Sequence, residues 1–135
     1  MEQRNIDRLC ADIGFSIPKG YEKKDELSKQ ENTIRKSLGI LAQDGIFAYL
    51  IWLESEKSLN PGDKVEEKVA KNIHEYTCKL LKSIKFVGED LDYKELKEEL
   101  KKSGGILDDV HQMFLVKQLF ERMLTYSLYS ARALP

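Results

Sequence analysis

The sequence has 135 residues, of which 41% are hydrophobic and 33% are charged, and its 22 basic and 23 acidic residues leave a formal net charge of −1. This length suffices for one domain with its own hydrophobic core, and the near balance of charges excludes a protein that binds nucleic acid through its overall charge. We therefore expect a single domain over residues 1–135, in which any anion site is a local patch.

The cysteines and the apolar runs predict the compartment. Cys10 and Cys78 are far apart and do not form a metal-type CxxC pair, so we expect two reduced, structural thiols. The charged stretch over residues 1–14 lacks the apolar segment of a signal peptide. The longest apolar run, residues 46–53, is shorter than the roughly twenty residues that span a bilayer. We expect a cytoplasmic protein without a membrane helix.

The N-terminal part of the chain predicts two helices. The first covers residues 2–13 and ends at Gly14, ahead of a loop that contains Pro18. A long helix begins near Asp25, where the apolar residues start to recur at helical spacing.

Asp44 and Gly45 interrupt the apolar part of this long helix. An Asp-Gly pair between apolar runs is a hairpin signal. Both flanks, however, keep one helical phase from Ile34 to Trp52, which favours a continuous helix. A glycine in a helix interior costs about 1 kcal/mol relative to alanine, and close approach of another helix offsets this cost, so Gly45 is the predicted helix crossing. A second apolar ridge, a candidate partner surface, comprises Ile40, Phe47 and Ile51.

The next predicted helix starts at the turn residues 60–63, with Asn60 as N-cap and Pro61 in the first helical position. It extends to about Ile84, and its apolar face comprises Val65, Val69, Ile73, Tyr76, Thr77, Leu80, Leu81 and Ile84. On the opposite side, lysines lie within a sector of roughly 80° of the same wheel. We name them the lysine stripe: Lys64, Lys68, Lys71, Lys79 and Lys82.

The C-terminal third predicts a short helix and a long one. Asp92 and Glu95 begin a charged helix that ends at residues 103–105, and the last helix covers residues 106–134. Its candidate core residues are Val110, Met113, Phe114, Leu119, Phe120, Met123, Leu124, Leu128 and Ala131. No strand pair is predicted. We therefore expect an all-α bundle of about five helices with two long helices at its centre.

The sequence carries none of the common catalytic motifs. The chain has no GxSxG, no GxxxxGK[ST], no GxGxxG and no HExxH pattern. Asp108, Asp109 and His111 are the residues closest to a metal-ligand cluster, which leaves a metal-dependent enzyme as a minor alternative. An N-cap at Asp108 or Asp109 explains the same residues better. We expect no catalytic residue, metal or cofactor.

The lysine stripe is the feature of the sequence that predicts a binding partner, the phosphate backbone of a nucleic acid. Lysines at helical spacing follow a phosphate backbone, and each neutralised phosphate releases counterions. The alternative is an ordinary solvated face, because Glu67 and Glu75 lie close by and dilute the charge.

Residues 43–53 read Gln-Asp-Gly-Ile-Phe-Ala-Tyr-Leu-Ile-Trp-Leu, and Lys57 follows. This segment resembles the small α-helical subunit family of the type III-B CRISPR (Cmr) RNA-silencing complex. In that family a long helix carries an apolar residue, a polar-Asn-Gly-Leu step and an apolar run that ends near a lysine. Asp44 stands where asparagine is usual. Residues 121–133 are similar to the family's closing helix, with Arg122 in place of a small residue.

The resemblance implies a non-catalytic scaffold whose copies stack beside the crRNA-bearing backbone subunits and help to seat target RNA. Its partners are then the other subunits, the crRNA and target RNA within the complex, and further copies of itself. The implied RNA contacts are the lysine stripe with Arg35, Lys36, Lys117, Arg122 and Arg132. Two alternatives stay open: the type III-A small subunit, which is likewise small and helical, and a helical protein–protein adaptor with no nucleic-acid role.

Overall fold

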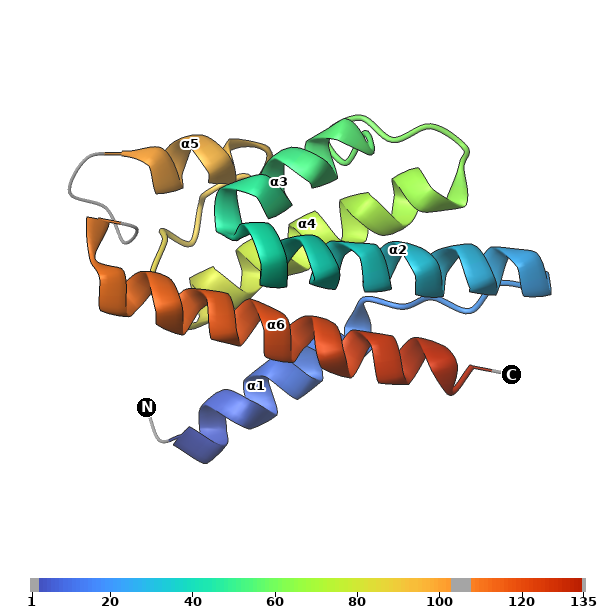
Figure 1. Ribbon diagram of the computed structural model, residues 1–135, viewed down its shortest axis with the longest axis horizontal. Coiled ribbons are helices and arrows are strands. Elements are labelled where there is room, and N and C mark those ends of the chain that lie inside the picture. The colour runs from blue at the N-terminus through green and yellow to red at the C-terminus, as the bar shows by residue number, and fades with distance from the viewer. Residues whose placement is uncertain (1–2, 103–107, 135) are drawn as a thin grey trace.

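The computed structural model describes residues 3–102 and 108–134, and within them all regular structure is helical. The elements are α1 (Gln3–Ser16), α2 (Lys24–Asp44), α3 (Ile46–Ser55), α4 (Val65–Ser83), the 3₁₀ helix η1 (Tyr93–Glu95), α5 (Leu96–Lys101) and α6 (Val110–Arg132). Figure 1 shows α2 in the middle, α6 beside it and α1 crossing α6. The all-helical prediction is confirmed. These residues hold six α-helices rather than five.

The extra helix arises at Gly45, where the long predicted helix divides. Gly45 has φ +96° and ψ −175°, and its N–H donates to the Leu41 carbonyl at 3.1 Å, so it ends α2 and precedes α3. A Cβ built on Gly45 would meet no atom within 4 Å in the described structure. Both the continuous helix and the crossing at Gly45 are therefore wrong predictions, because a positive φ is incompatible with a helix interior.

The close helix crossing is at Gly14, which the sequence suggested as a stop. Helix α1 continues past Gly14 to Ser16, and a Cβ on Gly14 would lie 2.5 Å from the Met123 carbonyl oxygen. The Ser127 hydroxyl donates to the Gly14 carbonyl at 2.7 Å. The missing side chain thus lets the backbones of α1 and α6 approach each other.

Tyr49 connects three helices in the core. It is fully buried on α3, its hydroxyl lies 2.7 Å from the Thr77 hydroxyl of α4, and its ring lies 5.9 Å from that of Phe120 on α6. Burial raises the pKa of the Tyr49 hydroxyl. The apolar segment that carries the resemblance therefore contributes Tyr49 to the core of the bundle.

Helix α4 buries the predicted face but begins later than predicted. Val65, Val69, Ile73 and Leu80 are buried. The first helical residue is Val65 and not residue 61, because Lys64 has an extended backbone conformation. The Gly62 N–H donates to the buried Glu67 carboxylate at 2.7 Å and joins the preceding loop to the first turn of the helix.

The start of α6 is exposed, against the prediction that it belongs to the core. Val110 is 59% exposed, Phe114 57%, Leu115 41% and Met113 36%. The Lys117 ammonium group donates to the carbonyl of Ala42, near the end of α2, at 3.1 Å. The turns of α6 before Lys117 thus lie beyond the last residues of α2 and lack its cover. The buried part of α6 runs from Val116 to Ala131.

Candidate nucleic-acid interface

The lysine stripe lies on the side of α4 opposite its buried face, as its spacing predicts. Lys64, Lys68 and Lys79 are exposed, and Lys71 and Lys82 are half-buried. Helix α4 packs against α1, α2 and α3, which fixes its apolar side inward and leaves the lysines facing outward.

One carboxylate interrupts the stripe. Glu75 lies between the lysines on the same wheel, and its Oε1 is 3.4 Å from the Lys71 ammonium group. Glu67, the other expected neighbour, is buried and binds the Gly62 N–H, so it does not dilute the stripe. Of the two glutamates expected to dilute the stripe, only Glu75 therefore pairs with one of its lysines.

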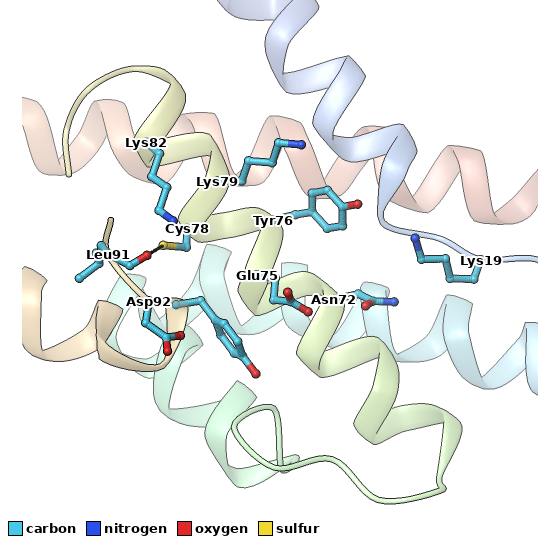
Figure 2. A pocket seen from close by; sticks show the side chains of 10 residues that line it. Lys19, Asn72, Glu75, Tyr76, Cys78, Lys79, Lys82, Leu91 and Asp92 are labelled. Carbon is cyan, nitrogen blue, oxygen red and sulfur yellow. Dashed lines mark hydrogen bonds between the residues drawn. The ribbon is translucent and has the colours of Figure 1, made fainter. Parts of the chain in front are cut away.

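A groove of about 440 Å³ lies along the C-terminal half of α4. Figure 2 shows its lining, which comes from α4, from the loop after α1 and from the segment before α5. The Cys78 thiol donates to the Leu91 carbonyl at 3.9 Å and joins two of these walls. Further lining residues are Lys19, Asn72, Tyr76, Lys79, Asp92 and Tyr93. We name this feature the Tyr76 groove.

Lys19 and Tyr93 of this groove were not predicted as site residues. Lys19 lies in the loop after α1, and its ammonium group is 5.8 Å from the centroid of the Tyr76 ring on α4. Tyr93 belongs to η1, and its hydroxyl donates to the Ser58 carbonyl at 2.9 Å. The fold brings these residues beside the stripe, and no spacing in the sequence signals it.

The other predicted RNA contacts lie on α2 and α6. Arg35 and Arg132 both bind the Glu31 carboxylate, the latter at 3.8 Å. Arg122 lies 3.6 Å from Asp7. Lys117 donates to a backbone carbonyl, as described above, whereas Lys36 is exposed and makes no ion pair with a described residue. Most of these cations already have a partner within the chain, so a phosphate would compete for them.

The predicted partner ridge is divided between two helices. Phe47 and Ile51 are 37% and 55% exposed on α3, one turn apart, while Ile40 is half-buried on α2. Gly45 separates them, because α3 takes a new direction after the break. The exposed start of α6 adds a second apolar surface.

One residue of the alternative metal site, Asp109, has a structural role. The Asp109 carboxylate caps α6 by accepting from the backbone N–H of His111 at 2.8 Å and of Gln112 at 3.3 Å. Within residues 3–102 and 108–134, no three His, Cys, Asp or Glu side chains are grouped to hold a metal ion.

A serine–histidine contact occurs in the interior. The Ser58 hydroxyl lies 2.8 Å from His74 Nδ1, and the rings of His74 and Tyr93 form a T-shaped pair with centroids 5.1 Å apart. Ser58 and His74 are both fully buried. This pair therefore ties the loop after α3 to α4 and to η1, rather than presenting a nucleophile to a substrate.

Comparison with protein-family models, with curated proteins and with solved structures found no match to this chain. None of the helices in the described part of the chain is long and apolar enough to cross a membrane.

Proposed function

We propose that this protein is a non-catalytic small subunit of a type III-B CRISPR ribonucleoprotein complex, which stacks beside the crRNA-bearing backbone and helps to seat target RNA. The observation that carries the proposal is that α3, which contains the segment that resembles the family, has one buried apolar side and one exposed apolar side. Its Tyr49, Leu50 and Leu53 are buried, whereas Phe47 and Ile51 are exposed. A subunit that packs its own core on one side of a helix and offers the other side to a neighbour has this arrangement.

The lysine stripe supports a second contact, with RNA. Its exposed lysines lie on α4, so one helix supplies protein contacts and another supplies cations for phosphates. Such contacts position a polynucleotide without reading its sequence. The small net charge of the chain fits weak RNA binding by the isolated chain and stronger binding by the assembled complex.

Co-expression with the other subunits of a Cmr complex and a crRNA tests the proposal. We expect the wild-type chain to co-purify in stoichiometric amounts. The double variant Phe47→Lys/Ile51→Lys should lose at least tenfold in incorporation, because it places two charges in an apolar contact. The control Ser55→Lys adds a charge at an exposed position of the same helix and should incorporate normally. A wild-type chain that does not join the complex contradicts the proposal.

A helical protein–protein adaptor is the second candidate, and the start of α6 favours it. Val110, Met113, Phe114 and Leu115 are exposed in consecutive turns, as in helices that insert into a partner's groove. Binding to an unrelated protein that persists at high salt, together with failure to join a crRNA-containing complex, supports this candidate.

A further inference from the structure

Two lysines from different elements converge on one tyrosine in the Tyr76 groove. The ammonium groups of Lys19 and Lys79 lie 5.8 and 5.5 Å from the centroid of the Tyr76 ring. Neither lysine forms an ion pair with a carboxylate in the described residues, although Lys19 also donates to the Ser16 carbonyl at 3.3 Å. Like charges gathered without a counter-ion repel each other, so this position favours an anion.

The groove has different chemistry at its two ends. In Figure 2, Lys19, Lys79 and Tyr76 lie toward one end, and Leu91 and Asp92 lie toward the other, together with a single lysine, Lys82. Glu75, in the middle, is already paired with Lys71. Asp92 accepts from the Lys94 backbone N–H and caps η1. A phosphate is therefore favoured at the Tyr76 end.

The ring of Tyr76 adds a stacking surface to this cationic end. Tyr76 is half-buried, so its ring is held in place by packing on the core while part of it faces the groove. Aromatic faces beside lysines bind single-stranded nucleic acid, because the bases stack and the cations follow the phosphates. A volume of about 440 Å³ exceeds what a bare phosphate needs.

We infer that the Tyr76 groove binds one nucleotide unit of single-stranded RNA, with the phosphate between Lys19 and Lys79 and the base on Tyr76. On binding, the two ammonium groups turn from the ring to the phosphate, which frees the ring face for the base. The inference deepens the proposed function, since it assigns a position to the RNA that the subunit helps to seat.

Fluorescence anisotropy of the isolated full chain with a labelled single-stranded RNA octamer tests this inference. We expect salt-dependent binding, and the variant Lys19→Ala/Lys79→Ala should weaken it roughly tenfold and lower the slope of log K against log salt by about one. Tyr76→Leu should cost at least about fivefold through lost stacking, and Tyr76→Phe should retain the affinity. Circular dichroism verifies that each variant is folded.

Matched variants and ligands separate the groove from non-specific attraction. Lys24→Ala/Lys101→Ala removes the same charge at two exposed lysines outside the groove and should change affinity less than twofold. Equal losses in the two double variants, or no binding by the wild-type chain, overturn the inference. Uridine monophosphate, which carries one phosphate and one base, should compete better than inorganic phosphate at equal phosphate concentration, and equal competition by the two overturns the inference. Incorporation into a Cmr complex is measured separately, so a negative result for RNA binding in the groove can be distinguished from a negative result for the proposed function.

Discussion

His74 is a buried residue whose protonation is coupled to folding near neutral pH. Its Nδ1 lies against the Ser58 hydroxyl, and its Nε2 is buried without a hydrogen-bond partner in the described residues. Burial lowers the pKa of His74 to about 4, while the Glu54 carboxylate raises it and the Lys97 ammonium group lowers it. The imidazole is therefore neutral in the native state near pH 7, as a nitrogen without a partner in the interior requires.

This pKa predicts a loss of stability in mild acid. Because the pKa of His74 is lower in the folded chain, about 4, than the ordinary 6.5, the unfolded chain binds the extra proton between these values. The stability that His74 contributes is complete above pH 6.5 and is lost as the pH falls toward 4. Between pH 7.5 and 5.5 the free energy of unfolding should fall by about 1 kcal/mol through this residue.

Urea unfolding at the two pH values measures this effect. The variant His74→Gln should show less pH dependence than the wild type by about 1 kcal/mol, whereas His111→Gln, at an exposed position of α6, should resemble the wild type. If His74→Gln retains the full pH dependence, the assignment to His74 is wrong.

At the scale of the element, hydrophobic spacing predicted faces well and helix ends poorly. The inward side of α4 followed from residues such as Val69 and Ile73, because one surface of a helix must be apolar to reach the core. The break at Gly45 was missed because the apolar residues of α2 and α3 stay in one helical phase although the chain changes direction between them. Phase reports which residues are buried, but not whether they belong to one helix.

The candidate site shows the same limit. The stripe follows from the spacing of lysines on one helix, so residues such as Lys68 and Lys79 were found from the sequence. Lys19 and Tyr93 join the groove only because the loop after α1 and the segment before α5 fold against α4. Contacts between distant segments have no local signal, since they depend on how the helices pack.

Alanine substitutions at three glycines should change the stability of the protein in different directions, because the three glycines differ in backbone conformation and in their neighbours. Gly14→Ala should destabilise the protein by about 1 to 3 kcal/mol, because the new methyl group meets the Met123 carbonyl in a packed crossing. Gly45→Ala should cost about 1 to 2 kcal/mol through its positive φ alone. Gly39→Ala, within α2 and in open space, should stabilise by about 0.5 to 1 kcal/mol.

Chemical unfolding of the three variants under one condition is the measurement. Gly39→Ala is the control, because it makes the same change in a helix interior with nothing in contact. A Gly45→Ala variant as stable as Gly39→Ala would mean that α2 and α3 form one continuous helix.

At the scale of the whole molecule, some cationic side chains are paired with carboxylates of the chain and others are not. On α2 and α6, Arg35 and Arg132 share the Glu31 carboxylate, and Arg122 lies against Asp7. By contrast, Lys68 on α4 and Lys64 immediately before this helix are exposed and form no ion pair with any residue the structure describes. The side of α4 that carries the stripe is therefore a part of the surface where cations are available to phosphates, even though the net charge of the chain is close to zero.

Charge reversal on α4 should consequently weaken RNA binding by an assembled complex without unfolding the subunit. Lys71→Glu/Lys82→Glu should lower target-RNA affinity roughly tenfold, because two phosphate contacts are replaced by repulsion. Loss of the Lys71 to Glu75 ion pair, which spans one turn of an exposed helix side, costs only about 0.5 kcal/mol of stability.

The control Lys24→Glu/Lys101→Glu makes the same change in net charge on α2 and α5. Titration of labelled target RNA at two salt concentrations compares the complexes, and equal affinity for the wild type and the α4 variant would exclude α4 as the RNA-facing helix.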